Sequence, residues 1–409
     1  MVVAIVGGGI FGQVIAWRLA ARGQRATVIE PVGPGSMGSG SGDRSRIVRA
    51  LYGEPGFAEA GYMGLELWAR WSLELGERLV DATGVIYIEG LGSSPAEAAY
   101  SAWLDKGVAN VRGLGGEAEE LGPEEARARW PALSAEGIRR VVLEAGGGFG
   151  RPALAARSIA RAALATGRVE FVPGAAREVK MRGGAAAGVR VEVLGGEEVE
   201  VEADAVVVAA GFAGVTLVQP LLGGMDLGIR RLPHFTTYWD VPYPAGAALH
   251  KSRLPAWADL GVSLYGFPDD GESGFKMAWH EPRREAGDVA GEAGDEAGEA
   301  GDPRGDEADK EPGAEELEAL RAAGEKRFPA LRGARYRGQY ACAYDSTPDE
   351  VFQIGPVPGT SGVYFVGGLS GHGFKHAPSI GESVAALVCG APQPIDLTPY
   401  ALRDAGRRP

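Results

Sequence analysis

The order of apolar and polar residues at the start of the chain predicts two strands joined by a helix. Val2 to Val6 is a continuous apolar run, typical of a strand buried on both faces. Ile10 to Arg22 places apolar residues at helical spacing and stops at Gly23, and Ala26 to Glu30 is a second short apolar run. Strand, helix and strand in this order predict a βαβ unit, in which the two strands are parallel.

Later segments repeat these patterns and divide the chain into two kinds of sheet. Further helices are predicted at residues 61–75, 96–106, 123–129, 150–167 and 378–388. Strands are predicted at residues 85–89, in a hairpin over 189–203, and in the fully apolar runs 205–211 and 363–367. From His234 to Tyr344 the strands are interrupted by Pro and Gly. We therefore expect one buried parallel sheet, built from the start, middle and end of the chain, and a separate sheet that faces a ligand.

Composition and charge narrow the class of protein. With 409 residues, 45% of them hydrophobic and 23% charged, the chain is long enough for two fused domains with a large core. Most of the net charge of −13 comes from residues 281–318, which hold 15 acidic and 4 basic side chains. The rest of the chain is nearly neutral and has no basic cluster, so nucleic acid is not an expected partner.

Residues 285–313 repeat variations on Ala-Gly-Glu and Ala-Gly-Asp. They contain almost no aromatic or branched apolar side chain, so little apolar surface is available to offset the entropy lost on ordering. This pattern predicts a mobile acidic insertion at the surface. A segment that docks a partner is the alternative.

Cysteine content and hydropathy predict a soluble cytoplasmic protein. The two cysteines, Cys342 and Cys389, are too few for a disulfide framework. No signal-peptide pattern precedes Val2, and no apolar run approaches the roughly 18 residues that a membrane span needs. The motifs HExxH, CxxC and GxSxG are missing, so metal-dependent hydrolysis, a structural zinc site and serine-esterase chemistry have no support.

The turn after the first strand carries a dinucleotide-binding pattern. Gly7, Gly9 and Gly12 have the spacing GxGxxG, which lets a pyrophosphate approach the N-terminus of the following helix. Backbone N–H groups of the first helical residues, Ile10 and Phe11, would contribute. Glu30 ends the second strand, where a carboxylate can accept hydrogen bonds from ribose hydroxyls, and this disfavours NADP. A tight turn without a ligand is the alternative.

NAD and FAD sites share this pattern, and five further stretches bear on the choice. They are GDRSRIVRALYGE at 42–54, LYGFP at 264–268, GFKMAWH at 274–280, RGQYACAYDSTPDE at 337–350 and GLSGHGFKHAPSIGE at 368–382. In sequence, order and approximate spacing, these stretches resemble the monomeric sarcosine oxidase family of the D-amino acid oxidase superfamily. The resemblance covers nearly the whole chain and implies FAD as the cofactor.

The resemblance also implies a fold and its division into domains. The expected class is α/β, with a Rossmann-like FAD-binding domain of the glutathione-reductase type and a second, mixed-sheet substrate domain. The FAD-binding domain would comprise residues 1–84, 146–222 and 350–409. The substrate domain would comprise residues 85–145 and 223–349.

Cys342, in the motif C-x-Y with Tyr344, occupies the place of the cysteine that family members join to the flavin. The resemblance therefore implies a thioether to the 8α-methyl group, and a thiolate is a suitable nucleophile for that bond. A buried cysteine that packs as an ordinary apolar residue is the alternative. The sequence departs from sarcosine-oxidising members at Gly40 and Ser41, where they carry histidines.

By the same resemblance, two groups of residues face the substrate carboxylate and the flavin ring. Arg49 would bind the carboxylate as a planar fork, with Lys375 as second anchor, and Arg46 would add positive charge beside the ring. The loop that contains Gly371, Gly373, Phe374 and Lys375 would offer backbone N–H groups to the flavin pyrimidine.

Lys276 resembles the lysine that family enzymes place over the flavin face opposite the substrate. A fixed ammonium there would stabilise the negative charge that dioxygen gains with its first electron. An edge-strand lysine with its head in water is the alternative. His280, Tyr344 and Tyr265 would line the substrate cavity and orient the amine.

The resemblance thus implies a monomeric FAD-dependent oxidase of secondary amines that uses dioxygen and releases hydrogen peroxide. Sarcosine, N-methylated aromatic amino acids, proline and pipecolate all remain open as substrates. One alternative is a biosynthetic oxidase of a cyclic imino acid. Another is a flavin-binding protein that has lost catalysis.

Overall fold

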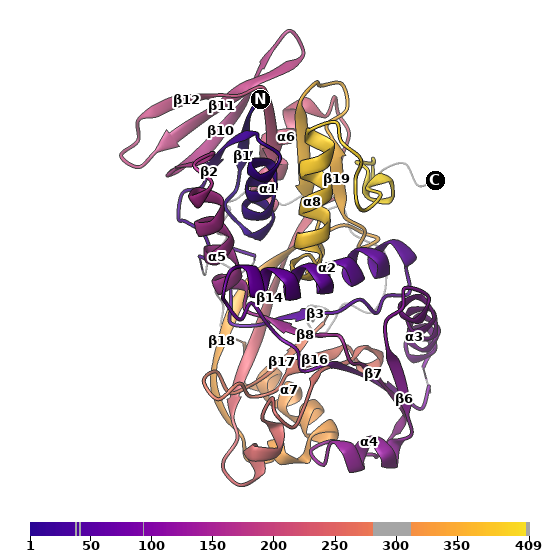
Figure 1. The fold of residues 1–409 in the computed structure, drawn as a ribbon. Coiled ribbons are helices and arrows are strands. Elements are labelled where there is room, and N and C mark those ends of the chain that lie inside the picture. The colour runs from indigo at the N-terminus through magenta and orange to yellow at the C-terminus, as the bar shows by residue number, and fades with distance from the viewer. Residues whose placement is uncertain (37–38, 41, 93, 281–311, 406–409) are drawn as a thin grey trace.

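The computed structural model describes residues 1–36, 39–40, 42–92, 94–280 and 312–405. Two layered parts are stacked in Figure 1, and the long helix α2 (Pro55–Glu74) crosses the molecule where they meet. Nearly all of the predicted acidic insertion, residues 285–313, lies outside the described residues.

The upper part is built on a six-stranded sheet that contains the predicted βαβ unit. Its strand order is β19 (Gln353–Pro356), β20 (Val363–Gly367), β13 (Ala205–Val208), β1 (Val2–Val6), β2 (Arg25–Ile29) and β9 (Val169–Val172). All neighbours are parallel except β19 and β20. Because the central strands are buried on both faces, their sequences are continuously apolar rather than alternating.

Helices cover one face of this sheet and a small sheet lies against the other. The helices are α1 (Ile10–Ala21), α5 (Pro152–Ala165) and α8 (Ala377–Val388), and α1 packs between the other two. The small antiparallel sheet comprises β10 (Gly174–Arg182), β11 (Ala185–Val193) and β12 (Glu198–Glu202), with α6 (Phe212–Val218) beside β10. The predicted hairpin over 189–203 is therefore β11 and β12.

The lower part is a mixed eight-stranded sheet. Its order is β18 (Arg335–Ser346), β14 (Arg230–Asp240), β17 (Phe275–Trp279), β16 (Leu264–Phe267), β15 (Ala256–Asp259), β5 (Val85–Gly90), β7 (Ile138–Glu144) and β6 (Ala118–Leu121). Only β15 and β5 are parallel neighbours. Helices α3 (Pro95–Gly113), α4 (Pro123–Arg129) and α7 (Ala314–Arg327) lie around it (Figure 1).

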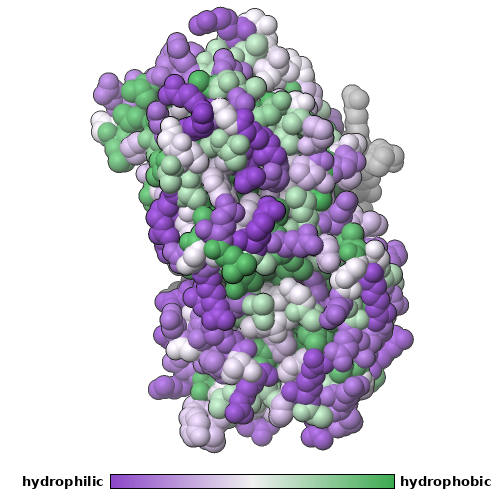
Figure 2. Space-filling view, in the orientation of Figure 1, coloured by the Kyte–Doolittle hydropathy of each residue, from purple (hydrophilic) through white to green (hydrophobic). Residues whose placement is uncertain are grey.

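A small three-stranded sheet lies between the two large ones. It comprises β3 (Arg46–Val48), β8 (Gly148–Gly150) and β4 (Val80–Asp81), with β8 in the middle. In the space-filling view, hydrophobic residues gather at mid-height, in the region that α2 crosses (Figure 2). Within the described part of the chain, no helix combines the length and apolar character needed to cross a membrane.

The predicted α/β class is confirmed, and the differences are local. The structure starts α2 at Pro55 rather than at residue 61, because proline is well tolerated in the first helical turn. The expectation of strands throughout residues 234–344 is wrong over Ala314–Arg327, which forms α7. The buried residues of this largely polar helix are Leu320, Gly324 and Arg327, so its apolar signal in the sequence is weak.

Candidate active site

One face of the eight-stranded sheet brings together most of the predicted site residues. Residues directly opposite each other on paired strands point to the same side of a sheet. Cys342 of β18 lies opposite His234 of β14, and Lys276 of β17 lies opposite Tyr238 of β14. Because His234 and Tyr238 are an even number of residues apart, Cys342 and Lys276 share this face. Two further predicted residues share it by the same spacing, Tyr344 on β18 and Tyr265 on β16.

Lys276 forms a buried ion pair on this face. The residue is 2% exposed, and its Nζ donates to Asp43 Oδ2 at 2.6 Å and to the Ser45 carbonyl at 2.9 Å. Strand β17 is paired on both sides, by β14 and β16, so the alternative of an edge lysine in water is wrong. Burial lowers the pKa of Lys276 to about 8, although Asp43 raises it.

Asp43 is the acceptor that joins the two cations of this cluster. Its Oδ2 also accepts from Arg46 Nη1 at 2.7 Å, and the Tyr238 hydroxyl donates to Oδ1. Burial alone would raise the pKa of Asp43, but Lys276 and Arg46 hold it below its ordinary value. Two cations and one carboxylate leave the cluster with one net positive charge. Asp43 was not singled out from the sequence, because a lone aspartate in a polar loop has the pattern of a turn residue.

Arg49 follows β3 and lies in an aromatic cage. Its guanidinium carbon is 3.8 Å from the ring centroid of Tyr52, 5.3 Å from that of Trp103 and 5.9 Å from that of Tyr87. Arg49 is 8% exposed and donates to the Leu51 carbonyl. In the residues that the structure describes, no carboxylate lies within ion-pair distance of it. Burial favours a lower pKa, yet the Tyr52 and Tyr87 hydroxyls and a nearby carboxylate raise the pKa of Arg49.

Lys375 is a second buried cation near the same ring. It is 5% exposed, its Nζ lies 5.8 Å from the Tyr52 centroid, and it donates to the His372 carbonyl at 2.8 Å. No ion pair to it is found among the described residues. Burial, Arg49 and Arg46 hold the pKa of Lys375 well below its usual range. A buried cation without an ion-pair partner is costly, and an anion bound between Arg49 and Lys375 would favour the protonated form of Lys375, so the two side chains form a site suited to an anion.

Tyrosine and histidine side chains line the space next to these cations. The Tyr265 hydroxyl lies 3.2 Å from that of Tyr344 and 3.3 Å from Nε2 of His234, and His234 stacks on Tyr344 at 4.3 Å. The ring of His280 packs edge-on against Tyr265 at 6.2 Å. Burial, Arg49 and Lys375 lower the pKa of His280 to about 4, so its imidazole is neutral at pH 7.

The turn after β1 has the geometry of a dinucleotide site. Gly7 has a φ of +104°, and a Cβ on Gly12 would overlap the Gly7 carbonyl oxygen. A Cβ on Gly9 would meet nothing within 4 Å, and α1 begins there without a side-chain cap or an acidic residue in its first turn. The open space and free N–H groups suit a pyrophosphate. Glu30, just after β2, accepts from the Gly8 N–H at 2.7 Å.

The other residues predicted to contact the cofactor are Ile10, Phe11, Phe374, Gly371 and Gly373, and they differ in which of their atoms a cofactor could reach. Ile10 and Phe11 are buried in the core and Phe374 stacks on Trp68 at 5.0 Å, so their side chains serve packing and only their backbone N–H groups are suitable. Gly371 lies against Tyr344, where a Cβ would come within 2.5 Å of the ring. Gly373 lies in the same loop, against Leu369.

These residues together fit FAD. Cys342 and Tyr344 are half-buried on a face whose neighbours are buried, and the turn at Gly9 is open. In addition, Oδ2 of Asp345 is buried without a partner, beside the glycine loop. Burial raises the pKa of the Cys342 thiol, whereas Arg46 lowers it.

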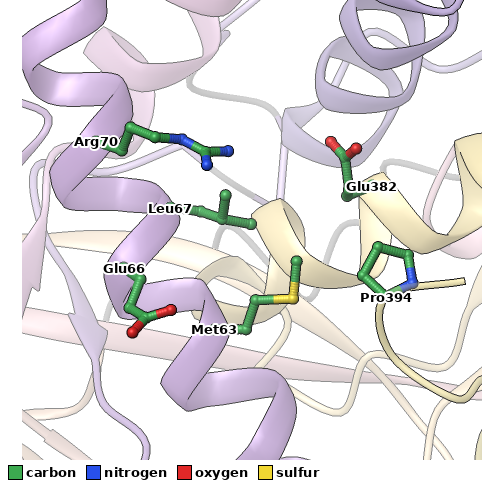
Figure 3. A pocket seen from close by; sticks show the side chains of 6 residues that line it. All are labelled: Met63, Glu66, Leu67, Arg70, Glu382 and Pro394. Atoms are coloured by element: carbon green, nitrogen blue, oxygen red, sulfur yellow. The ribbon is translucent and has the colours of Figure 1, made fainter.

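One pocket outside the candidate site carries none of the predicted residues. A pocket of about 360 Å³ between α2 and α8 is lined by Met63, Glu66, Leu67, Arg70, Glu382 and Pro394 (Figure 3). None of the cations described above lines it, so we assign no part of the reaction to it. Over the residues the structure covers, no group of three His, Cys, Asp or Glu side chains is placed to hold a metal ion.

The chain is similar to known proteins over nearly its full length. N-methyl-L-tryptophan oxidase of Yersinia pestis (strain Pestoides F) is 28% identical over 401 residues, which are 97% of each chain. Among solved structures, L-proline dehydrogenase from P. horikoshii matches with a TM-score of 0.77 at 21% identity and covers 98% of each chain. Glycine oxidase from Geobacillus kaustophilus matches with a TM-score of 0.74 at 20% identity, also over 98% of each.

The relative from Yersinia pestis is named as an N-methyl amino acid oxidase, so an enzyme that acts on CH–NH groups is favoured over a flavin-binding protein without catalysis. The two solved structures show the same fold. The match to a broader family model is nearly complete. The model described as DAO, FAD dependent oxidoreductase, covers residues 3–387. The chain therefore belongs to the DAO family of FAD-dependent oxidoreductases.

Proposed function

We propose that this protein oxidises secondary amino acids, either N-methylated or cyclic, with FAD as the electron acceptor and dioxygen as the final oxidant. The observation that carries the proposal is the pair of buried basic side chains, Arg49 and Lys375, which form no ion pair among the described residues. Lys276 and Arg46 differ, because they already share Asp43. The names of two relatives, N-methyl-L-tryptophan oxidase and L-proline dehydrogenase, support a secondary amine.

A substrate panel that reports peroxide release tests this proposal. We expect sarcosine, N-methyl-L-tryptophan, L-proline or L-pipecolate to give the highest kcat/KM. Matched secondary amines without a carboxylate, such as pyrrolidine and piperidine, should be far poorer. Carboxylate recognition would be contradicted if the enzyme oxidised only the amines without a carboxylate, or if it oxidised them as fast as the amino acids.

FAD held at this site would supply the electron acceptor: the carbon next to the amine nitrogen would lose a hydride and the nitrogen a proton, and the two electrons and two protons would leave on dioxygen as hydrogen peroxide. Arg49 and Lys375 would bind the carboxylate and so fix the distance of that carbon from the cofactor. Tyr344, Tyr265 and His280 would orient the amine. Because His280 has a pKa of about 4 and the pKa of Tyr344 is raised well above its ordinary value by burial, both are neutral at pH 7 and neither adds charge.

The remaining residues of the site have proposed roles around the cofactor. Glu30 would exchange its hydrogen bond with the Gly8 N–H for one with a ribose hydroxyl, and Arg46 would place positive charge near the ring. The oxidised product is an imine. Water hydrolyses an open-chain imine to an amine and an aldehyde, whereas a cyclic imine can leave intact.

The division into domains also remains a proposal. Every strand of the six-stranded sheet falls within residues 1–84, 146–222 and 350–409, and every strand of the eight-stranded sheet falls within residues 85–145 and 223–349. This partition supports an FAD-binding domain and a substrate domain, with the site between the two sheets.

We further propose that the flavin is bound covalently through Cys342. The half-buried thiol, the nearby Arg46 and the shared face with Lys276 support this. Acid precipitation of the wild-type protein should leave the yellow colour in the pellet. Cys342→Ala should release all its flavin into the supernatant, because no bond then joins the ring to the chain.

The second cysteine provides a matched control. Cys389 lies at the end of α8, so Cys389→Ala should retain the flavin in the pellet like the wild type. If wild-type protein releases its flavin completely, the covalent bond is wrong, although FAD binding is unaffected.

A further inference from the structure

Glu144, which the sequence analysis did not single out, holds the segment that carries Arg49. It ends β7, is 2% exposed and accepts three hydrogen bonds. Two come from backbone N–H groups: Ala50 donates to Oε1 at 2.6 Å, and Leu51 donates to Oε2 at 3.2 Å. Because Arg49 itself donates to the Leu51 carbonyl, the turn is fixed from both sides.

The third hydrogen bond links Glu144 to the aromatic cage. The Tyr87 hydroxyl donates to Glu144 Oε2 at 2.8 Å, and the Tyr87 ring is one of the three around the Arg49 guanidinium. Tyr87 is fully buried in β5, so its side chain cannot move to another χ1 rotamer without breaking this bond. Glu144 therefore positions Arg49 in two ways. It binds the backbone of the two residues that follow Arg49, and it holds the Tyr87 ring that lies beside the guanidinium.

Glu144 holds the turn and the Tyr87 ring without forming an ion pair with the Arg49 guanidinium. No ion pair joins Glu144 to Arg49 within the described ranges, so Glu144 does not take the place of an external carboxylate on the guanidinium. A carboxylate suits this place because it only accepts hydrogen bonds and has two oxygens for three donors. An amide would offer one accepting oxygen and an NH₂ group that faces a backbone N–H. An alanine would leave two buried N–H groups without an acceptor.

We propose that Glu144 is a positioning residue for substrate-carboxylate recognition, holding Arg49 through the Ala50–Leu51 turn and Tyr87. The inference rests on the proposed function, since it assumes that Arg49 binds the carboxylate. It predicts selectivity: loss of Glu144 affects ligands that carry a carboxylate and spares isosteres that do not.

The test uses the flavin-loaded protein and two ligands of the same shape, cyclopentanecarboxylate and cyclopentanecarboxamide, titrated against the flavin absorbance. Glu144→Ala should raise the Kd of the carboxylate about tenfold or more. Glu144→Gln and Tyr87→Phe, which each keep part of the network, should raise it by smaller factors. The Kd of the carboxamide should stay within about twofold. With an amino acid substrate, KM should rise while kcat at saturation changes little.

Glu89→Gln is the matched control. Glu89 is also 2% exposed and lies on β5, but it bonds Arg139 and Arg140 and takes no part in the site, so ligand affinities should be unchanged. Equal weakening of both ligands by Glu144→Ala would indicate general damage and overturn the inference.

If Glu144→Ala does not fold, Glu144→Gln and Tyr87→Phe test the positioning role instead, because each keeps part of the hydrogen bonding around Glu144. Unchanged carboxylate affinity in both Glu144→Gln and Tyr87→Phe would then overturn the positioning role. If that result accompanies a strong loss in Arg49→Met, the proposed function stands and only the inference about Glu144 fails. If Arg49→Met also binds the carboxylate normally, the proposed function itself fails.

Discussion

Arg49→Met is expected to weaken carboxylate ligands by roughly two to three orders of magnitude. Arg49 is buried and stacked on Tyr52, donates to the Leu51 carbonyl, and forms no ion pair with a carboxylate in the described structure. Removing one partner of a buried charge-assisted pair costs about 3–5 kcal/mol, because the other charge is left without compensation. Titration of the flavin spectrum with a carboxylate ligand measures the change directly.

Uncharged ligands separate lost recognition from general unfolding. A carboxamide of the same shape should lose much less affinity, since it never paired with the guanidinium. Arg44→Met is a suitable control, because Arg44 lies in the same basic stretch but is exposed, and its removal should leave both affinities unchanged. If Arg49→Met weakens both ligands equally, or neither, an amine without an acid group becomes the better substrate.

Lys276→Met is expected to slow reoxidation of the reduced enzyme by dioxygen roughly 100-fold or more, and to slow anaerobic reduction by substrate far less. The reason is that Lys276 and Arg46 together exceed the charge of Asp43 by one, and negative charge develops on dioxygen only in the second half-reaction. Stopped-flow measurements of the two half-reactions give the comparison. Equal effects on both would contradict an oxygen-specific role.

The same lysine predicts a pH dependence. With a pKa of about 8, Lys276 is an ammonium below pH 8 and loses its proton as the pH rises through that value. Wild-type reoxidation should therefore slow above pH 8, whereas Lys276→Met should show no step there. A step that persists in the variant would have to come from another group.

The sequence predicted those parts of the site that depend on local pattern. The glycine turn at Gly7–Gly12 and the strand β17 that carries Lys276 follow from spacing and apolar periodicity over a few residues, and the resemblance supplied the candidate roles. Asp43 and Glu144 could not be found in this way. Each acts through partners far along the chain: Asp43 through Lys276, 233 residues away, and Glu144 through Ala50, 94 residues away.

The same limit explains the local errors in secondary structure. Helix α3 runs from Pro95 to Gly113, beyond the predicted 96–106. Its start is fixed by the capping box that Ser94 and Glu97 form, whereas its end depends on packing against the rest of the protein. Helix α7 was missed because most of its surface is polar and its stability comes from contact with the sheet.

Residues that contact each other in the site are far apart in the sequence, and this affects how the chain folds during synthesis and whether fragments of it can function. The Tyr52 hydroxyl bonds His372 across 320 residues, and Lys276 reaches Asp43 across 233. Contacts of this kind close large loops, so in folding they form after local helices and hairpins. A ribosome must release almost the entire chain before the anion site can exist. No fragment cut at a sheet boundary would carry it, and recombinant halves would have to reassociate before a carboxylate could bind.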